Sequence, residues 1–151
     1  MNVVSGLRVS DEMMVKVTML WKRLRKDKEL AVLTDVTRSV VMRLAIYKGI
    51  DAMSRDREDW MLDNVGCYGA ASGTDKRHIS LSVPVWLLDS AQKLADLDTS
   101  GKTKRTHVLR CALRCGIERL EREEQWRLER EEQLRRANIF QGLPTDTRTE
   151  A

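Results

Sequence analysis

Three side chains able to bind a metal ion or act as nucleophiles recur every fourth residue: His107, Cys111 and Cys115. On a helix this spacing places them on one face. The outer two would lie about 12 Å apart along the axis, too far to share an ion whose ligand bonds are about 2.2 Å long. An adjacent pair could supply two ligands, but no other His–Cys cluster supplies the rest. Because small cysteines are common core residues, we expect a packed helix face and neither metal nor cofactor.

Catalytic groups are equally sparse elsewhere in the chain. It contains only two His residues, and neither belongs to a recognisable Ser–His–Asp set or stands near paired catalytic carboxylates. The glycines of residues 66–76 do not match the phosphate-binding loop, which needs Gly-Lys-Ser/Thr before a helix. The sequence therefore predicts a protein that is not an enzyme.

Composition limits the remaining classes. At 151 residues the chain is one domain or two small ones, and 42% hydrophobic residues with 5% aromatics predict a mainly aliphatic core. The net charge of +4 allows an anionic partner without requiring one. Three cysteines do not form a disulfide framework. No segment resembles a signal peptide or a transmembrane helix. We expect a reduced, cytoplasmic protein.

A strand and a helix are predicted on either side of Pro84. Residues 78–83 alternate with the period of a strand, which places two sets on opposite faces: Ile79, Leu81 and Val83 on one, and His78, Ser80 and Ser82 on the other. Pro84 ends the strand and suits the first turn of a helix. The apolar face of that helix is expected to contain Val85, Leu88, Ala91, Gln92 and Ala95, broadened by Trp86, Leu87 and Leu94.

A tight turn and a second helix follow. Asp, Thr, Ser and Gly cluster in residues 96–101, as is typical of turns. The second helix is predicted to start near Thr103, with Val108, Leu109, Ala112 and Leu113 directed inward. The order of elements is strand, helix, turn, helix.

The N-terminal part of the chain predicts the same order. A strand within residues 2–10 places Leu7 and Val9 on one face and Gly6 and Arg8 on the other. Ser10 is a good N-cap for the helix that follows. The next helix is expected to bury Met14, Val17, Leu20 or Trp21, and Leu24. It ends in the basic run of residues 22–28, which is either a solvated helix end favoured by the dipole or a phosphate contact. A second helix is predicted from about 35 to 48.

An internal repeat supports this correspondence. Residues 37–50 align with residues 104–117, and six positions match: Arg38, Val41, Arg43, Ala45, Gly49 and Ile50 with Arg105, Val108, Arg110, Ala112, Gly116 and Ile117. The strands align with a different offset, Val9 to Val83. The first helix of the first copy is therefore expected to be about two turns longer.

The alternating strand before Pro84, Gly101 in the turn and T-K-R-T-H-V-L-R-C-A-L at the second helix together resemble the ribbon-helix-helix superfamily of DNA-binding proteins. A single unit leaves its strand without a partner, so two units must intertwine. The resemblance implies that their strands pair into an antiparallel ribbon that enters the major groove of DNA.

The resemblance also implies two kinds of DNA contact. Base edges would be read by the outward strand residues, namely Val4, Gly6, Arg8, His78, Ser80 and Ser82. Arg8 is the strongest candidate, because arginine can bond guanine O6 and N7 together; Val4 and Gly6 depart from the polar pattern of the family. Phosphates would be held at the start of each second helix, by Val36 and Thr37 and by Thr103 and Lys104, with Arg38 and Arg105 in reinforcing positions.

The predicted fold is mainly α with a short two-stranded antiparallel β-ribbon: two tandem ribbon-helix-helix units paired within one chain, plus a long C-terminal helix. The expected segments are residues 1–50, 78–120 and 121–140, which form the first unit, the second unit and a charged helix. Residues 51–77 would be a linker with a short helix that packs Trp60 and Met61 on the core, and residues 141–151 a disordered tail. The linker is long enough for one chain to pair its own units.

The functional prediction is sequence-specific binding of double-stranded DNA. The role would be that of a transcriptional regulator or repressor, or of an accessory protein in DNA processing during plasmid conjugation. The alternative is a protein-interaction module such as an antitoxin, whose helix of residues 121–140 would bind a partner or mediate self-association.

Overall fold

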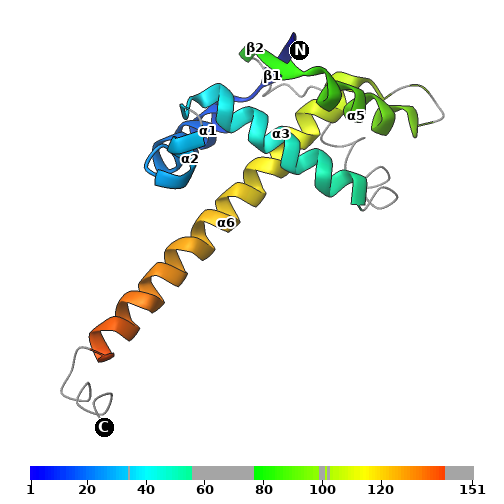
Figure 1. Cartoon of the computed structure of the whole chain (residues 1–151). Coiled ribbons are helices and arrows are strands. Elements are labelled where there is room, and N and C mark those ends of the chain that lie inside the picture. The colour runs from blue at the N-terminus through cyan, green and yellow to red at the C-terminus, as the bar shows by residue number, and fades with distance from the viewer. Residues whose placement is uncertain (34, 56–76, 99–100, 102, 142–151) are drawn as a thin grey trace. The chain divides into compact units, whose positions relative to one another are not determined.

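The computed structural model describes residues 1–33, 35–55, 77–98, 101 and 103–141, with the side chains of residues 30, 31 and 139–141 set aside. It is mainly helical with one two-stranded antiparallel sheet, as predicted (Figure 1). The predicted linker helix with Trp60 and Met61, and residues 142–151 of the predicted disordered tail, lie outside the described residues, whereas Gln141, predicted to be the first residue of that tail, is the last residue of a helix. In chain order the elements are β1 (Asn2–Val9), α1 (Asp11–Leu24), α2 (Lys28–Leu33), α3 (Arg38–Arg55), β2 (Arg77–Pro84), α5 (Val85–Asp96) and α6 (Arg105–Gln141).

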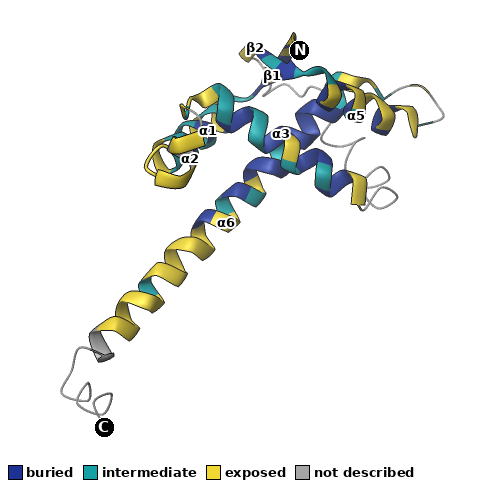
Figure 2. Ribbon diagram, viewed as in Figure 1, coloured by how far each residue is buried: buried dark blue, intermediate teal, exposed yellow. Residues whose placement is uncertain are grey.

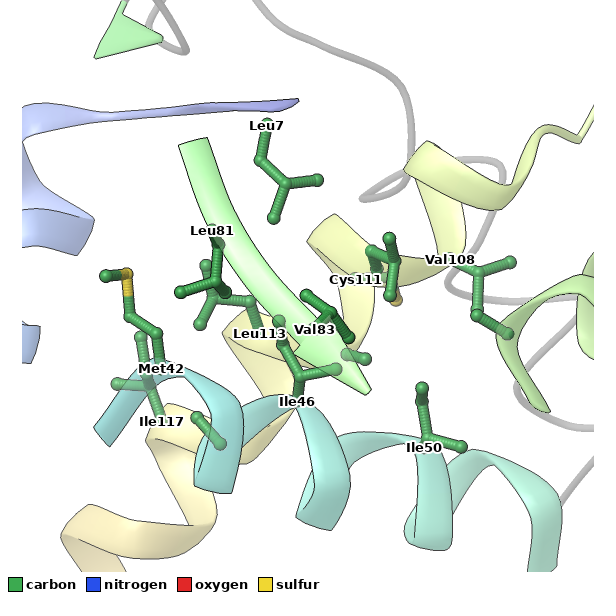
Figure 3. Packing of buried hydrophobic residues seen from close by; sticks show 14 of the residues in the cluster. Leu7, Met42, Ile46, Ile50, Leu81, Val83, Val108, Cys111, Leu113 and Ile117 are labelled. Atoms are coloured by element: carbon green, nitrogen blue, oxygen red, sulfur yellow. The ribbon is translucent and has the colours of Figure 1, made fainter. Parts of the chain in front are cut away.

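The chain divides into two compact units, Met1–Leu120 and Glu121–Ala151. In the first unit, β1 and β2 pair along their whole length, from Asn2 opposite Pro84 to Val9 opposite Arg77. The alternating apolar residues of both strands make the inner face of this ribbon, and Leu7, Val9, Leu81 and Val83 are buried there. In Figure 3, Leu7, Leu81 and Val83 lie over side chains of α3 and α6.

Helix α1 begins and ends through local hydrogen bonds. The Ser10 side chain accepts a bond from the Met13 amide at 3.1 Å, which confirms it as the N-cap. Val17 and Leu20 are buried as predicted, and Met13, which the prediction missed, is buried with them. Met14, Trp21 and Leu24 are only partly buried and pack against the core. The helix stops at Leu24 and is not two turns longer than its counterpart. Asp27 starts the separate helix α2 by accepting a bond from the Glu29 amide at 2.9 Å.

Helix α3 starts later and ends later than predicted. The Thr37 hydroxyl accepts a bond from the Val40 amide at 3.2 Å and thereby caps the helix, which continues past residue 48 to Arg55. Helix α5 follows Pro84 as expected, but its buried stripe is Leu87, Leu88, Ala91, Leu94 and Ala95. Trp86 is 57% exposed, and Gln92 is exposed too, because both face away from this stripe. Their assignment to the apolar face was wrong.

Helices α3 and α6 cross at very short range through small residues. A Cβ built on Gly49 would lie 2.0 Å from the Ala112 carbonyl oxygen, and one built on Gly116 would lie 1.7 Å from that of Ala45. Around this crossing the buried residues of both helices form the core under the ribbon, and burial is concentrated on α3 and the first half of α6 (Figure 2). Ile46, Ile50, Val108, Leu113 and Ile117 belong to it (Figure 3).

The described residues of the second unit, 121–141, continue α6 as a charged helix. Arg127 forms ion pairs with the buried Glu124 and, at 2.9 Å, with Glu131; Glu132 pairs with Arg135 and Arg136. Trp126 of this helix is 65% exposed. Across the described residues, no helix combines the length and the apolar character needed to cross a bilayer.

Candidate nucleic-acid interface

The outer face of the ribbon contains all six side chains predicted to read bases. The register sets Val4 opposite Ser82, Gly6 opposite Ser80 and Arg8 opposite His78. Ser82 is half-buried and the other five are exposed; Val4 reaches 70% exposure. Because strand residues alternate between faces, the same pattern that buries Leu7 and Leu81 directs this polar and apolar mixture outward. The structure therefore brings the six together on one surface.

The packing of His78 explains why a glycine stands in the middle of this surface. A Cβ on Gly6 would meet the His78 ring at 3.0 Å from Cε1 and 3.1 Å from Nε2. His78 is opposite Arg8 in the register, so its ring leans diagonally along the ribbon over Gly6. The departure of Gly6 from a polar pattern thus makes room for the imidazole.

Two arginines from the helices below hold the strands that carry these residues. The Arg110 Nε donates to the Arg8 carbonyl oxygen at 2.9 Å, and an Arg43 guanidinium nitrogen donates to the Ser82 carbonyl oxygen at 3.3 Å. Arg43 aligns with Arg110 in the repeat, and the strand offset that aligns Val9 with Val83 also aligns Arg8 with Ser82. Each arginine therefore contacts the strand of the opposite half, at matched positions.

Sequence reasoning noted the match between Arg43 and Arg110 but gave neither residue a role. The signal was an arginine at corresponding positions of two otherwise apolar helix faces. Arg110 is 5% exposed, and a buried guanidinium requires hydrogen-bond partners. Such an arginine is expected to position backbone, and here it fixes the backbone at Arg8, the strongest base-reading candidate.

The N-terminus of α3 is joined to the basic run after α1 through Trp21. The Trp21 indole N–H donates to the Val36 carbonyl oxygen at 2.8 Å. The guanidinium carbons of Arg25 and Arg38 lie 4.7 Å and 5.1 Å from the centroid of the Trp21 ring, within the range of cation–π attraction. Arg38 and the capping Thr37 are exposed. One residue of the basic run, Arg25, is thus brought to the predicted phosphate-binding end of α3.

The N-terminus of α6 is arranged differently. The Thr103 amide and hydroxyl both donate to one Asp98 carboxylate oxygen, at 3.0 Å and 2.6 Å. The Lys104 amide donates to His107 Nδ1 at 3.3 Å. The predicted phosphate contacts of Thr103 and of the Lys104 amide would compete with these bonds. The exposed side chains of Lys104 and Arg105 remain directed to solvent, and the Arg105 and Thr106 amides have no acceptor within the helix.

On the helix face with His107, Cys111 and Cys115, the two cysteines are buried and His107 is partly buried. Burial, and then the charges of Arg110 and Lys104, lower the pKa of His107. Burial raises the pKa of the Cys111 thiol to about 12, so the thiol stays protonated. No three His, Cys, Asp or Glu side chains are grouped closely enough to hold a metal ion in the part of the chain that the structure describes.

Charge is unevenly divided between the two units. Residues 1–120 contain 21 of the 27 Lys and Arg but only 15 of the 23 Asp and Glu, a net charge of +6 within the total of +4. The remaining 31 residues contain 6 basic and 8 acidic side chains. The unit that holds the ribbon is therefore the one suited to an anionic partner.

Searches of family models, curated proteins and solved structures found no match to this chain.

Proposed function

We propose that the chain binds double-stranded DNA by placing the β1–β2 ribbon in the major groove, as a single-chain pair of ribbon-helix-helix units. The observation that carries the proposal is the exposed outer face of a ribbon whose two strands come from the two halves of one chain. Within the part of the chain that the structure describes, Arg8, His78 and Ser80 are exposed on this outer side, while the apolar packing of the ribbon is on its inner side. The polar atoms of the outer side are available to a ligand.

The dimensions of the ribbon support the major groove as its binding site. Eight paired residues per strand span about 26 Å at roughly 3.3 Å per residue, and the strands are about 5 Å apart. The major groove is about 12 Å wide and admits a two-stranded ribbon. The narrower minor groove, about 6 Å wide, does not accommodate two strands with outward side chains such as His78 and Arg8.

The matched contacts of the two halves support the duplication. Gly49 packs on Ala112 while Gly116 packs on Ala45, and Arg110 bonds Arg8 while Arg43 bonds Ser82. Each contact has a counterpart in which both partners are exchanged for the aligned residues. This exchange is expected where two similar units intertwine around an approximate two-fold axis. It favours a chain that pairs its own halves over one that needs a second copy to complete the ribbon.

Phosphate contacts would come from the two helix starts on the basic unit. Arg38 and Thr37 stand at the N-terminus of α3, and Lys104 and Arg105 at that of α6. Helix N-termini attract anions through their free amides and dipole, and arginine and lysine add charge that steers DNA and strengthens non-specific binding. The base-reading ribbon would then be positioned between contacts that are independent of sequence.

Selection of bound duplexes from random DNA, followed by titration at several salt concentrations, tests the proposal. We expect a defined element, with an affinity that falls linearly on a log–log salt plot. Arg8→Ala should weaken binding to the selected element by about 1–3 kcal/mol and leave binding to random DNA nearly unchanged. Equal losses on both DNAs would contradict base reading by Arg8, and no binding to any duplex would contradict DNA binding itself.

A regulator and a conjugation accessory protein would share this DNA contact and differ in where the element lies. Locating the selected element in the genome that encodes this protein distinguishes the two roles. Sites upstream of genes support regulation, and a site at a transfer origin supports DNA processing. Both roles follow from the same ribbon chemistry, so neither changes the residues assigned to it.

A second candidate function rests on the exposed apolar side chains of residues 121–141. Trp126, Leu128 and Leu134 are 48–65% exposed, more apolar surface than a solvated helix requires. We propose this segment as a contact for a protein partner or for self-association. Replacing Trp126 and Leu134 by Gln should abolish a concentration-dependent increase in mass in sedimentation experiments while DNA binding by the ribbon persists. A mass that is independent of concentration before substitution would contradict self-association.

A further inference from the structure

The register of the ribbon defines an approximate centre of symmetry on its outer face. The strand offset that aligns Val9 with Val83 also aligns Gly6 with Ser80, and these two residues are directly opposite each other. A two-fold axis relating the halves therefore passes through the Gly6–Ser80 pair. The other outward pairs fall on either side of it: Arg8 with His78 at one end, and Val4 with Ser82 at the other.

The two ends are chemically unlike. At the first end, Arg8 contributes an exposed guanidinium with five donors, next to His78, whose ring is held over Gly6. At the second end, Val4 contributes a 70% exposed isopropyl group beside the half-buried Ser82. The aligned positions contain Ser82 where Arg8 would be repeated, and His78 where Val4 would be repeated. The symmetric ribbon backbone thus presents an asymmetric set of side chains.

Each end fits a different feature of the major groove. Guanine presents two adjacent acceptors, O6 and N7, which match a guanidinium, and thymine presents a C5-methyl, the apolar group of base edges in this groove. An isopropyl group placed against a donor or acceptor would leave that polar group unpaired. The thymine methyl makes no hydrogen bonds, so covering it with Val4 leaves no polar group unpaired.

We propose that the ribbon reads a non-palindromic DNA element with a guanine under Arg8 in one half and a thymine methyl under Val4 in the other. The inference rests on the proposed DNA binding and adds the base chemistry and polarity of the element. Arg8 and Val4 are four residues apart, about 13 Å at roughly 3.3 Å per residue. Since base pairs are about 3.4 Å apart, the two contacts are expected roughly three to four base pairs apart.

Modified bases test each contact on the full chain. Within the element selected from random DNA, each guanine is replaced in turn by 7-deazaguanine, which lacks N7, and each thymine by deoxyuridine, which lacks only the methyl. For the unsubstituted protein we expect one guanine position to lose about fivefold or more in affinity. One thymine position in the opposite half should lose about fourfold, the value of one buried carbon group.

Substitutions assign each position to its side chain. Arg8→Ala should abolish the dependence on guanine N7 while sensitivity to the thymine methyl persists, and Val4→Ala should do the reverse. Val3→Ala is the matched control, because Val3 has the same side chain, lies on the same strand and alternates toward the other face. It should retain both sensitivities. Val3, Val4 and Arg8 are all exposed, so the three variants are expected to fold.

Several outcomes would overturn the proposal. A palindromic element, or Arg8 and Val4 sensitivities in the same half, would contradict the assigned polarity. Loss of methyl sensitivity in Val3→Ala but not in Val4→Ala would contradict the assigned contact, as would no thymine position sensitive to deoxyuridine. In each of these cases the chain still binds duplex DNA, so the proposed function stands. Absence of duplex binding would contradict the proposed function itself and this inference with it.

Discussion

Gly49 and Ala112 meet where α3 crosses α6, and the distance between their backbones leaves no space for a side chain. A Cβ on Gly49 would lie 2.0 Å from the Ala112 carbonyl oxygen, which belongs to backbone and cannot rotate away. Gly116 has the same relation to Ala45. The pair of contacts fixes the distance between α3 and α6, the two helices whose core residues pack under the ribbon.

Gly49→Ala is expected to destabilise the fold by about 3 kcal/mol, because the helices must separate and the core must repack. In an exposed helix the same change would stabilise by about 1 kcal/mol, so the sign itself is informative. Urea unfolding followed by circular dichroism measures the effect. Ser54→Ala, on the exposed side of the same helix, should change stability by less than about 0.5 kcal/mol. A stabilised Gly49→Ala variant would contradict the close crossing.

Arg110→Met should cost more stability than Arg43→Met. Methionine keeps most of the aliphatic volume but leaves a strand carbonyl without its donor, which costs about 1–3 kcal/mol when that carbonyl is buried from water. The Arg110 bond to Arg8 is 2.9 Å long and Arg110 is buried, whereas the Arg43 bond to Ser82 is 3.3 Å long and Arg43 is only half-buried. Comparing the two urea midpoints provides an internal control. A larger loss for Arg43→Met would contradict this ranking.

Lys104→Ala should weaken binding to all DNA sequences alike and lower the slope of log affinity against log salt by about one unit. The exposed lysine stands at the start of α6, and the proposed function gives it a contact with phosphate charge rather than with a base edge. Fluorescence anisotropy on cognate and random duplexes measures both quantities. Arg130→Ala, on the acidic helix of residues 121–141, is the control and should leave the slope unchanged. An unchanged slope in Lys104→Ala would remove this residue from the phosphate contacts.

Arg25→Ala should also lower the salt slope by about one unit, although Arg25 lies thirteen residues before Arg38. Both guanidinium groups lie over the Trp21 ring beside the α3 N-terminus, so we expect them to approach the same phosphate region. Arg23→Ala is the matched control, because Arg23 is exposed in the same basic run. Equal effects of Arg23→Ala and Arg25→Ala would indicate a general charge effect of the run instead of a site built on Trp21.

Stability should fall as the pH is lowered below about 6.5, the ordinary pKa of His107. Burial lowers the pKa of His107 in the folded state, so the unfolded chain takes up the proton first, and protonation also removes the Nδ1 acceptor from the Lys104 amide. The stability that neutral His107 gives to the folded state is fully present above pH 6.5, and it is lost as the pH falls from there through the pKa of His107 in the folded state. His107→Gln should flatten the dependence between pH 7.5 and 5.5, since Gln at this position can accept the same bond. A His107→Gln variant that keeps the full pH dependence would contradict this role of His107.

The sequence by itself determined the elements whose signals are local. Alternation in residues 78–83 and at Leu7 and Val9 predicted both strands and their inner faces, because side chains of a strand alternate whatever lies beneath them. Ser10 and Pro84 marked the helix starts correctly, since capping is a property of a few neighbouring residues. The outward placement of Arg8, His78 and Ser80 followed from the same alternation.

Only the tertiary structure decided which strands pair and what the matched residues do. Nothing local sets Gly6 opposite Ser80, because register between strands more than sixty residues apart depends on the core that both must cover. The short helix α2 and the late start of α3 depended on caps at Asp27 and Thr37, which competed with the apolar pattern.

Several residues were given no role, or the wrong burial, from the sequence because their contacts are with residues far away in the chain. Arg43 and Arg110 bond strands of the opposite half, and Trp21 gathers Arg25 and Arg38. Trp86 is exposed because the buried stripe of α5 passes through Leu87 and Leu88 instead. These contacts join residues far apart in the chain, and periodicity describes only which side of a helix is apolar, not what lies across from it.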